Sequence, residues 1–495
     1  MTVRQLLDRA SIVVDNDPAL TAQAEVEATI RNVLGNVYLQ LGAYQQAEPL
    51  LRRALILSRQ VWTDDSPVTL DTANDLGVTL RQLNRLDEAS DLLSDVRSRR
   101  LRLHGPDHPK TISAENNLAI VLINRGQWPE AEGMLRNCRE RIRRIPGFDE
   151  REYLFIVANL AWVLESQENT PAKVVEAAKL LRDHMSDFRR IWGEKSTEIY
   201  TVWDSLGTAL RLLGDPVTAV EWHHKALEGR RFALAEDHDL TLASRNNLAL
   251  ALRETGKFEE AERIFRALLA TKSPTGIIEL RRQYYLHNLA LALRDQGRIV
   301  EAEPYMRESY EIFRRVPGPT HPETLAVVGG LLDLQVLRGG WADAEIVLLE
   351  VVPAMRGKKD TPSALVAELR HRLGWVRLRL DKYVEAESDL RAGLEHREKV
   401  MPESWATFNT KSMLGGSLLG QKKYADAEPL LRTGYEGMKQ REKTIPAQAK
   451  VRLSEALDRL IELFIATNKP DEAKKWRAER AKYPTPEAPK PADKK

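Results

Sequence analysis

The sequence of 495 residues lacks several features that mark common protein classes. Its single cysteine, Cys138, excludes an internal disulfide bond and any metal site built from several thiolates. No apolar run approaches the roughly 18–20 residues that cross a bilayer. The amino terminus also lacks the apolar segment and small-residue cleavage site of a secretory signal. We therefore expect a cytoplasmic protein in a reducing compartment, with no membrane insertion.

The sequence also lacks an excess of one charge and any recognisable catalytic motif. Lys and Arg number 74 against 72 Asp and Glu, so the net charge of +2 favours neither nucleic acid nor an anionic membrane as partner. A glycine-rich phosphate loop, a His-Arg-Asp loop and an Asp-Phe-Gly motif are all missing, since Asp187-Phe188 is followed by Arg189. No nucleophile–base pair or metal-ligand spacing appears. We expect no enzymatic activity, no cofactor and no metal.

What the sequence does contain is a tandem repeat. A glycine or similar residue is followed two positions later by a large apolar residue and five positions later by alanine. After an irregular fourth unit, which we expect to turn within residues 168–173 before Ala177, the pattern resumes. Most steps are 41 or 42 residues, which is typical of a repeat architecture. Its ten copies begin at Gly42, Asn84, Gly126, Gly214, Gly256, Gly297, Gly339, Asp381, Lys422 and Asn468.

Each element of the repeat has a mechanical reason. A leucine and a small residue, such as Leu76-Gly77, stand eight and seven residues before the turn, where they let two helices pack closely. The glycine ends the first helix in a left-handed conformation, and the second helix follows, for example from Tyr44 to Trp62. We predict an all-α, right-handed α-solenoid of about eleven helical hairpins. It comprises an amino-terminal lead-in (1–20), the solenoid (21–481) and a disordered Pro/Lys-rich tail (482–495).

Turn-rich stretches such as DDSPVT (64–69) and HGPDHPKT (104–111) separate the hairpins. Asp, Ser or Thr can cap the next helix, and Pro fits its first turn. Histidines recur at these corners, but a separation of about 42 residues places them in different repeats, too far apart to share a metal ion. They are His104, His108, His238 and His321.

The 42-residue unit, the Asn-Asn-Leu-Ala signature at 116–119 and 246–249, and the GPDHPKT linker resemble the tetratricopeptide repeats of kinesin light chains. The resemblance covers about Ala22 to Trp476. Residues 2–10, 34–55 and 424–464 are also similar to the carboxy-terminal repeat region of bacterial, especially planctomycete, serine/threonine protein kinases. Since the kinase motifs are absent, the chain resembles the repeat module alone.

This resemblance implies a protein-binding scaffold that holds partner peptides in a concave groove lined by the first helix of each hairpin. The groove of kinesin light chains takes short peptides with acidic and aromatic residues, which favours acidic or carboxy-terminal segments as ligands. The alternative is a regulatory or sensory repeat module of a serine/threonine kinase pathway, itself non-catalytic. The partner's identity and the oligomeric state stay open.

A set of Asn and Arg residues recurs in register on these first helices. At 100° per residue, Asn246 and Arg253 share a face turned away from the core residue Leu248, and Asp204 with Arg211 repeats the offset. Asn offers a donor and an acceptor to a peptide backbone, and Arg offers a planar fork to a carboxylate. The candidate peptide-binding residues are Arg81, Asn117, Asn159, Arg211, Asn246, Asn247, Arg253, Asn288 and Arg294.

A plainer interpretation of the same residues is that they are solvated side chains of an amphipathic helix, with the asparagines bonded locally. Other notable residues have structural explanations. We place Cys138 in the core as a small apolar side chain. His223 and His224, in the middle of a second helix, are expected to pack or face solvent. The aromatic residues at the start of second helices, Trp128 among them, are assigned to hairpin packing.

Overall fold

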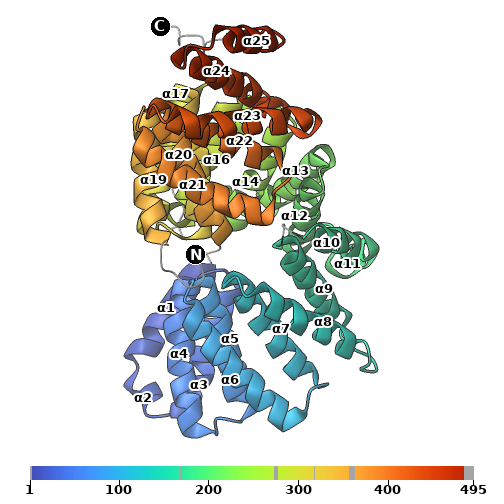
Figure 1. Cartoon of the computed structure of the whole chain (residues 1–495). Helices are drawn as coiled ribbons and strands as arrows, with labels where there is room; N and C mark the ends of the chain where they lie inside the picture. The colour runs from blue at the N-terminus through green and yellow to red at the C-terminus, as the bar shows by residue number, and fades with distance from the viewer. Residues whose placement is uncertain (1–2, 168–169, 272–276, 317, 356–362, 484–495) are drawn as a thin grey trace. The chain divides into compact units, whose positions relative to one another are not determined.

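A computed structural model describes residues 3–167, 170–271, 277–316, 318–355 and 363–483. Within these ranges the chain is α-helical apart from two short 3-10 turns. It divides into two compact units, Met1–Lys257 and Phe258–Lys495, which are described separately (Figure 1). The division falls between the two helices of the sixth repeat.

Helices alternate along the first unit as the repeat predicts. Two helices of the lead-in, α1 and α2, precede the first hairpin, and the second half of the fourth hairpin is split into α10 and α11. The bounds are α1 Val3–Asn16, α2 Pro18–Thr21, α3 Ala24–Gln40, α4 Tyr44–Val61, α5 Pro67–Gln82, α6 Leu86–His104, α7 Pro109–Asn124, α8 Trp128–Ile142, α9 Glu150–Glu165, α10 Pro171–Asp183, α11 Met185–Trp192, α12 Thr197–Leu212, α13 Pro216–Ala233 and α14 Asp239–Glu254.

The second unit continues the pattern to the end of the described chain. Its last hairpin is reached through two 3-10 turns, Glu442–Thr444 and Ala447–Ala449. The bounds are α15 Phe258–Ala270, α16 Ile277–Asp295, α17 Ile299–Arg315, α18 Pro322–Leu337, α19 Trp341–Met355, α20 Ser363–Arg379, α21 Tyr383–Val400, α22 Trp405–Gly420, α23 Tyr424–Gln440, α24 Val451–Ala466 and α25 Pro470–Arg480. The predicted α-solenoid is confirmed. The tail beyond Tyr483 lies outside the described residues.

The turn inside each hairpin that follows the repeat pattern has the predicted left-handed residue, whereas the turn expected within residues 168–173 of the fourth hairpin lies partly outside the described residues. Gly42 has φ of 70° and Gly126 has φ of 74°. The repeats without glycine keep this conformation, at a small energetic cost where the residue is Asn or Asp, because these tolerate it better than most residues, and at a larger cost where it is Lys. These positions are Asn84 (φ 58°), Asp381 (58°), Lys422 (62°) and Asn468 (53°).

The small residue after the recurring leucine permits close helix contact, as the sequence predicts. A Cβ atom built on Gly77 would lie 2.6 Å from Cγ of Leu93, and one built on Gly35 would lie 2.6 Å from Cγ of Leu51. Leu93 and Leu51 are fully buried. These hairpins are therefore closed by a leucine of the second helix that packs directly onto the backbone of the first, and Gly374 with Leu390 and Gly415 with Leu431 repeat the contact.

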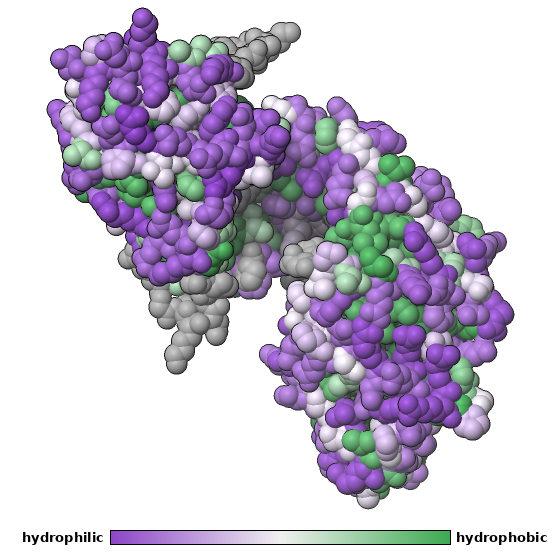
Figure 2. Space-filling view, turned by 45° about the vertical axis from the view of Figure 1, so that its right-hand side comes forward, coloured by the Kyte–Doolittle hydropathy of each residue, from purple (hydrophilic) through white to green (hydrophobic). Residues whose placement is uncertain are grey.

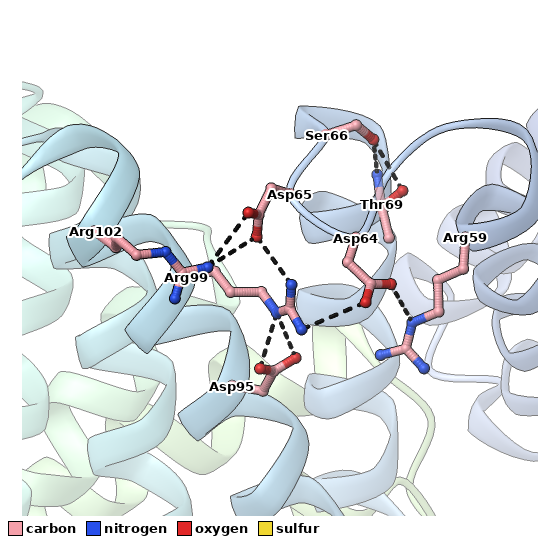
Figure 3. A network of polar contacts seen from close by, with 8 residues as sticks. All are labelled: Arg59, Asp64, Asp65, Ser66, Thr69, Asp95, Arg99 and Arg102. Atoms are coloured by element: carbon pink, nitrogen blue, oxygen red, sulfur yellow. Dashed lines mark hydrogen bonds and ion pairs between the residues drawn. The ribbon is translucent and has the colours of Figure 1, made fainter.

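The linker between α4 and α5 shows how one hairpin is tied to the next. Ser66 caps α5 by accepting a hydrogen bond from the Thr69 backbone, 3.2 Å away, and Pro67 occupies the first turn. Arg99, from α6, reaches back to this linker and donates to Asp65 over 2.9 Å and to Asp95 on its own helix (Figure 3). Asp65 accepts hydrogen bonds from both Arg99 and Arg102, and these lower its pKa, the bond from Arg99 contributing most.

The linker histidines have a structural role that the sequence analysis missed. We expected Asp, Ser or Thr as caps, but in three linkers the cap is the histidine before the first turn. Nδ1 of His108 accepts from the Lys110 backbone over 3.2 Å, and His238 and His321 cap α14 and α18 in the same way. His104 stacks on His108 with ring centroids 4.4 Å apart.

Consecutive second helices are joined by ion pairs that the sequence analysis also missed. A glutamate following the recurring alanine pairs with a basic residue near the next hairpin's turn, so each pair links two repeats. The glutamate of each pair is at most 28% exposed, and its basic partner is 29–50% exposed. They are Arg85–Glu48 at 3.0 Å, Lys173–Glu132 at 2.7 Å, Arg298–Glu262 at 2.6 Å, Lys382–Glu345 at 2.5 Å, Lys423–Glu387 at 3.1 Å and Lys469–Glu428 at 3.1 Å.

Two further expectations have mixed outcomes. Cys138 is fully buried, as predicted, and burial is the largest cause of its raised pKa. Trp128 is 39% exposed, so its assignment to hairpin packing is only partly right. In the described part of the chain, the helices are all too short or too polar to cross a membrane.

Candidate functional site

The first helices of consecutive hairpins contact one another directly. In the first unit these contacts include α3 with α5, α7 with α9 and α12 with α14, and in the second α20 with α22 and α22 with α24. This arrangement places the predicted Asn and Arg residues on neighbouring helices. All nine are half-buried. Seven belong to the first unit, whereas Asn288 and Arg294 belong to the second, so the two sets are described apart.

In the first unit the asparagines link consecutive repeats. Nδ2 of Asn117 donates to Oδ1 of Asn74 over 3.0 Å, and Nδ2 of Asn159 donates to Oδ1 of Asn116 over 2.9 Å. Further along, Nδ2 of Asn246 contacts Oδ1 of Asn247 at 3.4 Å. Each of these amides therefore has at least one hydrogen bond within the chain, between repeats for Asn117 and Asn159 and between sequence neighbours for Asn246. The second amide hydrogen of Asn117 and of Asn159 is the donor that each side chain could offer to a ligand.

The arginines of the first unit differ in their surroundings. Arg211 forms an ion pair with Glu254 of the next repeat, at 2.7 Å, so its charge is balanced within the chain. Burial lowers the pKa of Arg81, which lies near the Tyr44 hydroxyl. Arg253 is half-buried on α14, the first helix of the hairpin that follows the one with Arg211.

In the second unit, Arg294 bonds to its sequence neighbour Asp295, with Nη2 and Oδ1 2.8 Å apart. It also lies close enough to Asp333 of the next first helix to lower that carboxyl's pKa, although burial has the larger and opposite effect and the pKa of Asp333 is raised. Asn288 is half-buried on the same helix as Arg294.

The expectation that Asp204 shares an outward face with Arg211 is wrong. Asp204 is only 6% exposed, and Oδ1 accepts from Nδ1 of His223, which lies 2.8 Å away on the second helix of the same hairpin. Its other oxygen contacts Arg230 and accepts from Ser244 over 2.5 Å. The carboxylate is turned inward because a guanidinium and an imidazole are buried beside it.

This cluster brings Asp, His, Ser and Arg together, but it is closed to solvent. His223 is fully buried, and a Cβ on Gly207 would lie 2.9 Å from its Nε2, so no room remains for a substrate. His223 occupies the position that holds Leu51 and Leu93 in other repeats, and this exchange of leucine for histidine was the sequence signal for the cluster. Among the described residues, none form a group of three or more His, Cys, Asp or Glu suited to a metal ion.

Family models for the tetratricopeptide repeat match residues 26–101, 198–272 and 283–356, with further matches at 246–318 and 111–149. Together they cover more than half of the chain. The chain belongs to the tetratricopeptide repeat family. No curated protein sequence matches it.

Several solved structures are similar to this chain, one of them with a TM-score of 0.50. The apo form of the quorum sensor NprR from B. thuringiensis is 12% identical, with a TM-score of 0.50 over 74% of this chain and 97% of that one. A putative kinesin light chain from Podosopora anserina with nearly identical TPR-like repeats is 19% identical over 51% of this chain and 95% of that one, with a TM-score of 0.22. BtubC (BKLC) from P. vanneervenii is 17% identical over 55% and 94%, with a TM-score of 0.28.

Proposed function

We propose that this protein is a scaffold that binds partner peptides, favouring acidic or carboxy-terminal segments, along the face formed by its first helices. Tetratricopeptide repeat proteins are generally non-catalytic scaffolds for protein–protein interaction. The observation that supports the ligand class is the set of half-buried Asn and Arg residues in register on neighbouring first helices of the first unit. Figure 2 shows that most of the surface on the side it presents is hydrophilic, with smaller hydrophobic patches.

The contacts define how such a peptide would be held. Asn117 and Asn159 would offer their remaining amide hydrogen and their carbonyl oxygen to an extended backbone. Arg211 would exchange its Glu254 partner for a carboxylate of the peptide, which is a near-neutral step because one ion pair replaces another. In the second unit, Arg294 and Asn288 would act in the same manner.

Charge reversal tests this proposal. Partners captured from a lysate by the wild-type chain are compared with those captured by Arg211→Glu/Arg253→Glu. Arg190→Glu is the matched control, because its guanidinium is 57% exposed on α11, a second-helix segment of the same unit. We expect the double variant to lose a specific set of partners that the control keeps. Equal capture by all three proteins would remove this face from consideration.

The resemblance of residues 2–10, 34–55 and 424–464 to kinase repeat regions supports a narrower version of the proposal. In it, one captured partner is a separate serine/threonine kinase chain. Detection of a kinase in the wild-type capture but not with the double variant would support that version, and a kinase-free capture would exclude it.

A further inference from the structure

In the second unit, arginine side chains from two helices gather around a pair of tryptophans. The rings of Trp341, on α19, and Trp375, on α20, meet edge to face with centroids 5.2 Å apart. The Arg379 guanidinium lies 5.0 Å from the centre of the Trp341 ring, and that of Arg452, from α24, lies 4.5 Å from the centre of the Trp375 ring. Arg379, Trp341, Trp375 and Arg452 therefore form one continuous stack, called here the Arg–Trp stack.

Helix α22 has a glycine where α24 packs against it. Gly416 of α22 is so close to α24 that a Cβ would lie 2.8 Å from Cδ of Arg459, whose Nη1 donates to Oγ of Ser412 over 3.1 Å. The result is a second layer of cationic side chains beside the stack.

The cluster has more cations than its carboxylates can balance. Glu455 is shared between Arg452, at 2.9 Å, and Arg459, at 3.6 Å. Arg372 has only loose partners, with Asp333 and Glu368 each 3.7 Å away. Within the described part of the chain, no carboxylate lies within ion-pair distance of Arg379.

Elsewhere in this unit, arginines are matched more fully. Arg377 bonds to Glu345 and Asp389, and Arg432 bonds to Glu428 and Glu472, all within 3.2 Å. At the cluster, burial lowers the pKa of Arg459, and the charges of Arg452 and Arg379 lower it further against the opposite effects of Glu455 and Asp458. Cations held together in this way repel one another, so an incoming oxyanion would relieve the repulsion as well as gain hydrogen bonds.

We propose that the Arg–Trp stack, with Arg372 and Arg459, is a binding site for a peptide segment that carries closely spaced oxyanions. Arg379 is exposed and would make the first contact, and Arg452 and Arg372 would bind further groups through their planar forks. The indole rings keep Arg379 and Arg452 in place, so little side-chain entropy is lost on binding. The site uses none of the candidate peptide-binding residues of the first unit, so the outcome of a test on one site does not decide the other.

The test is direct binding of a fluorescently labelled poly-glutamate peptide to the full chain at low salt, followed by anisotropy. We expect saturable binding that weakens as salt is added. The variant Arg379→Gln/Arg452→Gln should bind about tenfold more weakly or worse, since two charge-assisted contacts are lost. Arg391→Gln is the matched control, because Arg391 is 59% exposed in the same unit and pairs with Glu387. It should bind as the wild type does.

Two further arms make the result decisive. A peptide with phosphoserine in place of glutamate shows which oxyanion the site prefers, and a single-stranded oligonucleotide of equal charge shows whether a peptide is required. Equal binding by the double variant and the control, absence of binding at low salt, or equal affinity for the oligonucleotide would each overturn the proposal. Melting curves of all variants check folding, and Arg379→Gln alone replaces the double variant if that does not fold.

Discussion

Nη1 of Arg397 donates a hydrogen bond over 3.2 Å to Nε2 of His371, and both side chains are buried in the ninth hairpin. Because a guanidinium can only donate, Nε2 of the imidazole accepts. Nδ1 of His371 then carries the proton and faces Oγ1 of Thr410 at 3.3 Å. A second proton on this histidine would break the bond to Arg397 and place two cations together.

The stability of the second unit should therefore fall in mild acid. Burial, followed by the charges of Arg397, Arg372 and Arg452, holds the pKa of His371 well below its ordinary value of 6.5. The unfolded chain takes up the proton near 6.5 and the folded chain does not, so this contribution is complete above that pH and declines below it. Urea unfolding of the wild type and of His371→Gln, compared at several pH values, isolates the effect because all other groups are common. A constant difference between the two proteins would contradict it.

Glu165 should act with the opposite sign. It is 8% exposed, its Oε1 accepts from Ser205 over 2.9 Å, and its Oε2 has no partner. Burial raises the pKa of Glu165 well above 4.5, so stability is complete below that pH and is lost as the pH rises through the folded-state value.

Glu165→Gln, which keeps the Ser205 contact without a charge, should be more stable than the wild type near neutral pH. The expected gain is about 1–3 kcal/mol in the free energy of unfolding. Urea unfolding at a series of pH values should show the gain shrinking towards pH 4.5. A gain that does not depend on pH would mean that charge is not its cause.

Gln335 should be replaceable with a gain in stability. Its side chain is fully buried in α18, and neither Nε2 nor Oε1 has a hydrogen-bond partner among the residues that the structure describes. Other repeats hold leucine at this position, such as Leu252 and Leu293. Gln335→Leu should raise the free energy of unfolding by about 1–3 kcal/mol, because two unsatisfied polar atoms are removed. The reverse exchange, Leu293→Gln in the same unit, should lower it. An unchanged or lower urea midpoint for Gln335→Leu would count against this account.

The repeat pattern alone predicted most of the fold, since each hairpin has the same periodicity, turn and close contact. The position of Asp204 was predicted wrongly because a helical wheel gives the direction of a side chain around its own helix. It does not show the charged groups that are buried on the next helix. The Arg–Trp stack was missed because its residues come from α19, α20 and α24, and the periodicity within one repeat does not predict side-chain contacts across three helices. The two 3-10 turns before α24 do have a trace in the sequence, as Lys422 and Asn468 are 46 residues apart where other steps are mostly 41 or 42. The positions of the nine groove residues on first helices were predictable, but their ion-pair partners were not.

The close contact between Gly77 and Leu93 should make even one methyl group costly. In an exposed helix, Gly→Ala normally stabilises by about 0.5–1 kcal/mol, because alanine has less backbone freedom to lose. At Gly77 the new Cβ would lie 2.6 Å from Cγ of the fully buried Leu93, so the leucine or the helix must move. Overpacking of this kind costs about 1–3 kcal/mol. Gly133, on α8 of the same unit, has open space around it and is the matched control. In urea unfolding followed by far-UV circular dichroism, Gly133→Ala should raise the midpoint and Gly77→Ala should lower it. If both substitutions raised the midpoint, the two helices would have room for the extra methyl group despite the short distance to Leu93. Glycine at position 77 would then not be required for them to pack together.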